Sequence, residues 1–306
     1  MRSLVEQLLD TLIVLFGVST LVFLLLVMIP GDPVDVVLGE SAQAADREAM
    51  RAALGLDRPL LERWGLFYLD LAHGDLGDSL VRRQPVAQLI AQRLPATLQL
   101  AGAAFLLVLV LALPLGILAA RNRGRGLDRL AQGFALFGVS IPNFWLGPLL
   151  VLLFSVYLGW TPVSGNLEPG SLLLPAITLG LSMAAITTRM VRSSLLEIES
   201  QPFLRTARCK GLSETAVMLR HSLPNAMLPV ITVLGLQLGG LLAGAVITEV
   251  VFAWPGIGSL LVDAIRQRDY PVVQGVVLFI ALSYVLVNRL SDLLSGWLDP
   301  RIHGAD

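Results

Sequence analysis

Cysteine, histidine and lysine are almost missing from this sequence of 306 residues. The chain has one cysteine and three histidines, and Lys210 is its single lysine. One cysteine cannot form an internal disulfide, and three scattered histidines cannot supply the ligands of a zinc site. We therefore expect no metal site in this chain.

Charge of either sign is also scarce. Charged residues make up 15% of the chain and the net charge is −1, so no basic excess is present to attract nucleic acid. A phosphate-loop ATPase needs a lysine in the pattern G-x-x-x-x-G-K-[ST], and Lys210 stands in no such pattern. The G-x-S-x-G elbow of serine hydrolases is missing as well. The sequence predicts neither nucleic-acid binding nor ATP hydrolysis nor this type of hydrolase chemistry.

Apolar residues are what the sequence has in excess. They make up 55% of the chain, and the mean hydropathy of +0.74 is too high for a soluble globular protein. A helix needs about 20 apolar residues to cross the hydrocarbon of a bilayer. Six stretches qualify, at residues 8–29, 94–120, 130–160, 171–188, 226–248 and 272–298. We predict an all-α integral membrane protein with six transmembrane helices.

Two of these stretches allow another interpretation. Residues 8–29 resemble a signal peptide, but the apolar run is long and "IPGDP" follows where a small-residue cleavage site would be needed, so we expect a retained span. Residues 130–160 are too short for two crossings. Pro142 and Pro148 within them predict a lead-in segment, a kink and then the span.

The arginines indicate the orientation of the spans. The loop "RNRGRGLDR" at 121–129 and the segment 189–220 are rich in basic residues, whereas the loop 161–170 has none. Both basic segments lie on one side if six spans alternate, and short basic loops stay in the cytoplasm. Both termini are therefore expected to be cytoplasmic.

The segment 30–93 falls on the external side. It holds several arginines, but loops longer than about 60 residues cross the membrane largely regardless of charge. Its stretches "REAMRAALGL" and "LLERWGLFYLDLAH" have the apolar spacing of helices. We predict four regions: an N-terminus with the first span (1–29), a small extracytoplasmic helical cap (30–93), a core of five spans (94–298) with a cytoplasmic loop at 189–225, and a cytoplasmic tail (299–306).

The longest cytoplasmic loop contains the unusual stretch "RTARCKGLSETAVMLRHSLPN" at 205–225. We expect a helix capped by Ser200, a left-handed stop at Gly211, and a second helix from Ser213 that Pro224 ends. Phe203, Leu204 and Ala207 would share the apolar face of the first helix, and Arg205, Arg208, Lys210 and Arg220 would be exposed. The stretch is therefore either an element that docks on another protein or an amphipathic helix on anionic lipid headgroups.

This stretch resembles the cytoplasmic loop of permease subunits in bacterial binding-protein-dependent ABC importers. The family pattern is Glu-Ala-Ala, three residues, Gly, nine residues, Ile-x-Leu-Pro, and Ala207, Gly211, Leu223 and Pro224 match it in register. Arg, Thr and His stand at the other pattern positions. This departure is similar to the oligopeptide, dipeptide and nickel branch of the family.

Further motifs of that branch occur in order along nearly the whole chain. They are "PGDP", "LGLDRPL", "GDLGDSL", "LPATLQLAGAA", "GVSIPNFWLG", "FAWPGIG", "RDYPVVQG" and "DPR". The resemblance implies the type I importer permease fold in the bacterial cytoplasmic (inner) membrane. It also implies a heterodimer with a second permease, two ATPase subunits that use ATP and Mg, and an extracytoplasmic solute-binding protein. This chain itself would bind no cofactor.

The resemblance also implies site residues and a solute class. Coupling to the ATPase is assigned to the loop residues Arg205, Thr206, Ala207, Arg208, Lys210, Gly211, His221, Leu223 and Pro224. For His221 a hydrogen-bonding role at a helix end competes with a role as a pH sensor. The solute would be a dipeptide, an oligopeptide or nickel, with glutathione or another small solute as the alternative.

Candidate residues of the translocation path lie on the fifth span. They are Gln237, Gly240, Gly244 and Glu249. Gly235, Gly239, Gly240 and Gly244 also form a small-residue face, which favours close helix packing over a narrow path. On the sixth span, Arg289 and Asp292 are expected to pair on one helix face.

Two functions of other classes stay open from the residues alone. A membrane enzyme would need paired catalytic polar groups in facing spans, and a secondary transporter would need carboxylates for coupling ions at mid-membrane. The spans offer few such groups beyond Asp10 and Gln237. Both classes are therefore less favoured than a permease.

Overall fold

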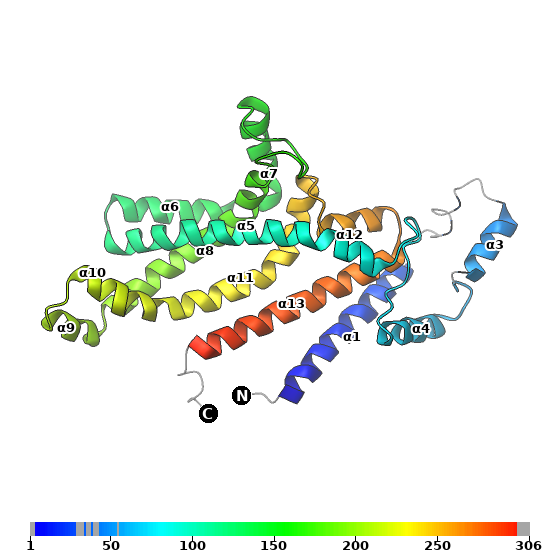
Figure 1. Ribbon diagram of the computed structural model, residues 1–306, viewed down its shortest axis with the longest axis horizontal. Coiled ribbons are helices and arrows are strands. Elements are labelled where there is room, and N and C mark those ends of the chain that lie inside the picture. Colours follow the sequence, from blue (N-terminus) through cyan, green and yellow to red (C-terminus); the bar gives the residue numbers. More distant parts are fainter. Residues whose placement is uncertain (1–3, 29–33, 35–37, 39–42, 54, 299–306) are drawn as a thin grey trace. The chain divides into compact units, whose positions relative to one another are not determined.

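The computed structural model describes residues 4–28, 34, 38, 43–53 and 55–298, and the regular elements of these residues are helical (Figure 1). In chain order they are α1 (Leu4–Met28), α3 (Ala44–Ala53), α4 (Leu60–Ala72), α5 (Val86–Arg121), α6 (Gly126–Ser140), α7 (Asn143–Leu150), the π-helix η1 (Val151–Tyr157), α8 (Leu173–Glu199), α9 (Pro202–Cys209), α10 (Glu214–Val217), the π-helix η2 (Met218–Ser222), α11 (Leu223–Val251), α12 (Ile257–Arg266) and α13 (Tyr270–Leu298).

The predicted number of membrane spans is confirmed. Within the residues that the structure describes, five helices are long and apolar enough to cross a membrane, and a sixth crossing results when the bent pair of α6 with α7 and η1 is taken as one span. The five straight candidates are Leu9–Met28, Val86–Arg121, Leu173–Glu199, Glu214–Leu241 and Tyr270–Ser291.

The chain divides into two compact units. Unit 1 contains residues 1–97 and 255–283, and unit 2 contains residues 98–254 and 284–306. The sequence placed everything from 94 to 298 in one core, so this division differs at 255–283. These residues belong to unit 1 because α12 and the beginning of α13 bury their apolar side chains against the first turns of α5.

Unit 1 is held together by that apolar cluster and by three hydrogen bonds, two of them buried. Thr97 Oγ1 accepts a hydrogen bond from the Ile257 amide at 2.8 Å, which fixes the beginning of α12 on α5. Asp269 is 2% exposed, and its carboxylate accepts from Ser79 Oγ at 2.5 Å and from the Leu80 amide at 3.1 Å. These contacts fix the loop before α5 to the connection between α12 and α13, because a buried carboxylate needs its hydrogen-bond donors.

The predicted external helices are present as α3 and α4, and α4 packs on α1. Tyr68 of α4 stacks on Phe16 of α1 with ring centroids 5.1 Å apart, and its hydroxyl lies 2.5 Å from Ser19 Oγ and 2.8 Å from Thr20 Oγ1. Phe67 stacks on Phe23. These contacts lie on the second half of α1, and the location of the cap on the outer face of the spans stays a prediction.

In unit 2, α8 packs against α6, α7 and α11. Small residues permit these close approaches. A Cβ added to Gly138 of α6 would lie 2.7 Å from the Ala185 Cβ of α8, and one added to Gly180 of α8 would lie 2.9 Å from the Ala104 carbonyl oxygen of α5. Helix α8 also continues to Glu199, beyond the span of 171–188 predicted from hydropathy. The loop predicted at 189–225 is correspondingly shorter.

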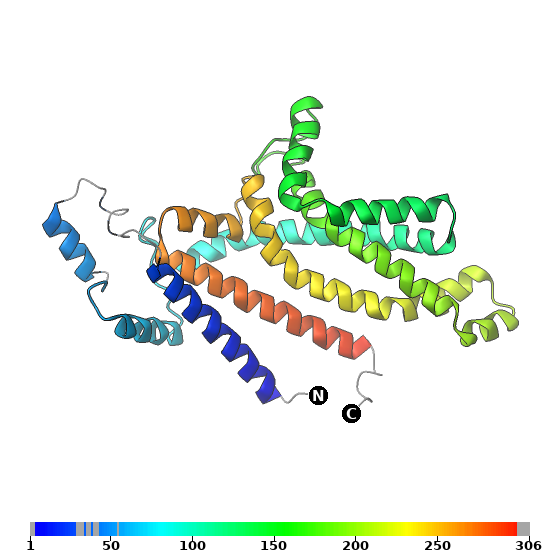
Figure 2. The same ribbon diagram turned by 180° about the vertical axis from the view of Figure 1, so that it is seen from behind.

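The third span bends where Pro142 predicted a kink. Helices α6 and α7 meet at 105°, with Ile141 and Pro142 in extended conformation between them. A residue before proline is disfavoured in a helix, which explains the break. The part before the kink is a full helix packed on α8 rather than a short lead-in (Figure 2). Pro148 lies inside α7 without ending it, and the π-helical η1 follows.

The glycine face of α11 serves close packing against α13. An added Cβ at Gly235 would lie 2.7 Å from the Ser291 Cβ, and one at Gly239 would lie 2.7 Å from the Asn288 Oδ1. Gly240 differs, because no atom lies within 4 Å of its added Cβ. The interpretation as a packing face is therefore supported at Gly235 and Gly239.

We expect Gly235→Val to destabilise unit 2 by about 1–3 kcal/mol, since the larger side chain forces α11 and α13 apart. Thermal unfolding of the purified membrane complex in detergent measures this loss. Gly133→Val on α6, where no atom lies within 4 Å of an added Cβ, is the matched control and should leave the melting temperature near that of the wild type. Equal melting temperatures for both variants would contradict the packing role of Gly235.

Candidate functional site

The loop that the sequence singled out folds as two short helices around a glycine turn. Gln201 precedes α9 and Pro202 occupies its first turn. Gly211 follows α9 with φ of +79°, a conformation that favours glycine. Ser213 caps α10, because its Oγ accepts a hydrogen bond from the Ala216 amide at 3.3 Å. The predicted left-handed stop and the start of the second helix are as expected.

Two local expectations for this loop were wrong. Ser200 does not cap α9, since its Oγ donates to the Glu197 carbonyl oxygen at 2.7 Å at the end of α8. Pro224 does not end the second helix either. The π-helical η2 precedes it and α11 continues through it, while the Asn225 side-chain amide donates to the His221 carbonyl oxygen at 2.7 Å. Proline has no backbone N–H, so the carbonyl oxygen that this group would bond needs another donor. The wider turn of η2 and the hydrogen bond from Asn225 to His221 let the helix continue there.

A small apolar core holds the two short helices together. Leu204 is fully buried and Ala207 is 8% exposed, and both pack with Val217 of α10. Phe203, expected on the same apolar face, is 43% exposed instead. Successive residues of a helix are about 100° apart, so Phe203 lies at the edge of a buried face that is centred between Leu204 and Ala207.

An ion pair bridges the glycine turn. Arg208 Nε lies 2.9 Å from Glu214 Oε1, and Arg208 Nη2 lies 3.3 Å from Glu214 Oε2. Hydrogen bonding to Glu214 raises the pKa of the Arg208 guanidinium, which therefore stays charged at neutral pH. Arg208 was expected to be exposed and was assigned to coupling with the ATPase. The structure instead engages it within its own loop, a pairing that the six-residue separation across Gly211 did not reveal.

The remaining loop residues divide into an exposed and a packed set. Exposed residues are Arg205, Thr206, Arg208, Lys210, Gly211, Arg220 and Pro224, and half-buried ones are His221 and Leu223. The expected exposure of the four cations is confirmed. Ala207 was expected to contact a foreign surface, but it is buried against α10, because a small side chain is what lets α9 approach α10. The helix also continues through His221, so this residue does not lie at a helix end.

A second polar cluster lies where α6 meets α8. The Asp128 carboxylate is 2% exposed and accepts from Arg192 Nε at 2.6 Å and from Arg192 Nη2 at 2.8 Å. It also accepts from the Gly124 amide at 2.8 Å and from Gln132 Nε2 at 3.0 Å. Sequence reasoning missed this cluster, since the two charges are far apart in the chain. It fixes the arginine-rich loop before α6 onto α8.

The candidate path residues on α11 have different environments. Gln237 Oε1 accepts a hydrogen bond from Thr187 Oγ1 of α8 at 3.1 Å, while its Nε2 atom is buried without a partner in the described part of the chain. Gly240 is exposed. The surroundings of Gly244 lie outside the described residues, as does the side chain of Asp292, so the expected pair with Arg289 stays a prediction.

Glu249 is fully buried at the end of α11. Its carbonyl oxygen accepts from the Trp254 amide at 2.8 Å, and Trp254 is 1% exposed. The connection between them bends sharply at Ala253, whose φ is +48°. Glu249 therefore belongs to a packed helix end, and its assignment to the translocation path stays a prediction.

Comparison with known proteins relates the whole chain to one family. Residues 112–304 match the model of the binding-protein-dependent transport system inner membrane component, and residues 1–101 match the N-terminal model of the same transport-system membrane components. The chain is 44% identical over 302 residues, 99% of each chain, to the glutathione transport system permease protein GsiC of Escherichia coli O6:H1 (strain CFT073). It is 43% identical over 318 residues, 94% of each chain, to the dipeptide transport system permease protein DppB of Escherichia coli K12.

A solved structure shows the same fold. The inward-facing MetNI methionine ABC transporter aligns with a TM-score of 0.60 at 20% identity, over 70% of this chain and 97% of the other. ABC importers combine permeases with ATPase and binding-protein partners, so such partners follow from this membership, as does a multi-pass location in the bacterial inner membrane. The chain belongs to the binding-protein-dependent transport system inner membrane components and is the permease subunit of an ABC importer, not an enzyme.

Proposed function

We propose that this permease imports short peptides. The observation that carries the proposal is identity above 40% over nearly the full length to permeases of glutathione and of dipeptide transport. Both solutes are small peptides with free charged ends. Glutathione is the second candidate within this class. No observation favours nickel, which the sequence motifs had left open.

We further propose that α9 and α10 form the coupling element that enters the ATPase. The exposed surface of this element carries Phe203, Arg205 and Lys210, while Ala207 and Gly211 set its shape from within. In this proposal, the ATPase closes on ATP with Mg and moves the coupling element as a rigid body, because Arg208 and Glu214 bridge the turn. This movement would switch the permease between inward and outward states.

The orientation belongs to the same proposal. Within unit 2, the arginine-rich connection between α5 and α6 lies at the same end as α9 and α10 in both views (Figure 1, Figure 2). Positive charge gathered at one end supports a cytoplasmic location for that end. Cytoplasmic termini follow if six spans alternate.

A second permease subunit would complete the path. Gly240 lies on α11 with open space beside it, and the exposed Leu236 lies one turn before it. We infer that this face of α11 meets the homologous subunit, with Gln237 beside the path between them. The buried Gln237 Nε2 without a partner supports this assignment, since a buried amide donor otherwise costs about 1–3 kcal/mol.

Uptake by the reconstituted system tests the solute class. The two permeases, the ATPases and the binding protein are placed in lipid vesicles, and uptake of dialanine, trialanine, glutathione and chelated nickel is measured with and without ATP. We expect ATP-dependent uptake of the peptides that exceeds nickel uptake by at least about tenfold, the ratio that a difference of about 1.4 kcal/mol produces. Nickel uptake without peptide uptake would refute the proposal.

A further inference from the structure

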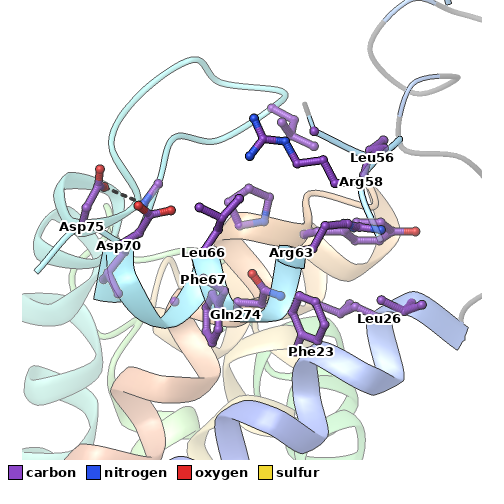
Figure 3. A pocket seen from close by; sticks show the side chains of 18 of the residues that line it. Phe23, Leu26, Leu56, Arg58, Arg63, Leu66, Phe67, Asp70, Asp75 and Gln274 are labelled. Atoms are coloured by element: carbon purple, nitrogen blue, oxygen red, sulfur yellow. Dashed lines mark hydrogen bonds between the residues drawn. The ribbon is translucent and has the colours of Figure 1, made fainter. Parts of the chain in front are cut away.

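Unit 1 contains a cavity of about 420 Å³ beside α4. It is lined by α1, by the end of α3, by the segments before and after α4, by α4 itself and by the beginning of α13 (Figure 3). Cavities of a few hundred Å³ with an apolar floor and a few polar groups are typical of small-molecule sites. Phe23 and Leu26 of α1 are buried at this floor. None of its lining residues belongs to the coupling element or to α11.

One face of α4 gives the cavity opposite charges at its two ends. Arg63, Leu66, Phe67 and Asp70 line it and follow the spacing i, i+3, i+4, i+7, which places them on one side of a helix. Arg63 and Asp70 are two turns apart, a rise of about 10.5 Å at 1.5 Å per residue. The helix thus carries a cation and an anion with apolar side chains between them.

Neighbouring charges reinforce each end. Arg58 lines the cavity near Arg63, and Asp75 lines it near Asp70, where the Asp75 amide donates to the Asp70 carbonyl oxygen at 2.9 Å (Figure 3). Arg58 is held by Glu62 at 3.3 Å. Within the described residues, neither the Arg63 guanidinium nor the Asp70 carboxylate has an ion-pair partner of its own.

Helix stability does not explain this arrangement. A helix favours acidic residues in its first turn and basic residues in its last turn. Arg63 lies in the first turn of α4 and Asp70 in the last, so both charges have the unfavourable sign for their position. Charges that oppose the helix dipole and point into a cavity indicate selection for a ligand rather than for folding.

We propose that this cavity binds the two charged ends of a short peptide on its way to the translocation path. The C-terminal carboxylate would pair with Arg63 and Arg58, and the N-terminal ammonium with Asp70 and Asp75. An extended chain reaches at most about 3.3–3.6 Å per residue, so a tripeptide spans about 10 Å and matches the separation of the two ends. The side-chain amide of Gln274 on α13 lies between the ends and would serve the peptide backbone (Figure 3).

This inference rests on the proposed peptide transport, and direct binding tests it. The membrane complex of permeases and ATPases is placed in nanodiscs without the binding protein, and binding of radiolabelled trialanine is measured. We expect Arg63→Gln and Asp70→Asn each to weaken binding by about tenfold, since each removes a charge-assisted contact. Arg83→Gln and Asp57→Asn change exposed charges of the same unit outside the cavity, and they should bind as the wild type does.

Blocked peptides identify which end each residue binds. The C-terminal amide of trialanine should bind the wild type about tenfold more weakly but lose no further affinity in Arg63→Gln, and the N-acetyl form should behave likewise with Asp70→Asn. The comparison of blocked with unblocked peptide is made on the same variant, so a variant that folds less well lowers the binding of both peptides equally. The proposal would be overturned if the amide peptide lost a further tenfold in affinity for Arg63→Gln, or the N-acetyl peptide for Asp70→Asn.

Two further outcomes separate this inference from the proposed function. If the wild-type transporter imports trialanine while both cavity variants bind it normally, the cavity assignment fails and peptide transport stands. If the variants weaken only association with the binding protein, the cavity is a protein contact and the assignment also fails. If the wild type imports no peptide, the proposed function itself fails.

Discussion

Arg192→Ala is expected to lower the free energy of unfolding by about 3 kcal/mol. Asp128 is 2% exposed and Arg192 is its cationic partner through two hydrogen bonds, so the variant leaves a buried carboxylate without a counterion. Removal of one partner from a buried ion pair costs about 3–5 kcal/mol. The lower end applies because the Arg192 side chain is 22% exposed. Urea titration of the permease in micelles measures the loss.

Two companion variants separate this effect from a general loss of positive charge. Arg189 lies on the same helix, and its side chain is exposed, so Arg189→Ala should change stability by less than about 0.5 kcal/mol. The double variant Asp128→Asn with Arg192→Ala should be more stable than Arg192→Ala alone, since a neutral amide is less costly to bury than a charge. A double variant less stable than the single one would show that the buried charge is not the cause.

Gly211→Val is expected to lower ATP-driven uptake by at least about tenfold while the permease stays assembled. Gly211 has φ of +79°, and a residue with a side chain in this region is strained by roughly 1–2 kcal/mol, more when it is β-branched. No atom lies within 4 Å of an added Cβ, so the strain comes from the backbone alone. The core of Leu204, Ala207 and Val217 is too small to hold α9 in place against it. Uptake and ATPase activity in vesicles report the effect.

Gly211→Asn is the matched control for this prediction. Asparagine tolerates the left-handed region better than other residues, so the Asn variant should keep most of its uptake. Size-exclusion chromatography of the complex checks that the spans are intact in both variants. Normal uptake by Gly211→Val would mean that the turn does not transmit the movement of the ATPase.

Several features of this protein follow from its sequence without a structure. The apolar runs required six membrane crossings, since an unpaired backbone cannot lie in hydrocarbon. Gly211 required a left-handed turn, and Pro142 required a break in the third span. The register of Ala207, Gly211, Leu223 and Pro224 indicated the permease family, which the comparisons confirmed. These conclusions depend on local backbone constraints and on spacing, and both are readable along the chain.

Tertiary structure alone decided the rest. The local sequence around Ala207 does not tell whether this residue faces a partner protein or α10. The packing of α9 on α10 decides that it is buried. The sequence gives no sign that Asp128 and Arg192 form a pair, because they come together only when α6 packs on α8. The charged cavity likewise needs α1, α4 and α13 to meet. Spacing within one helix fixes which residues share a face, whereas the free energy of packing between distant segments decides what that face meets.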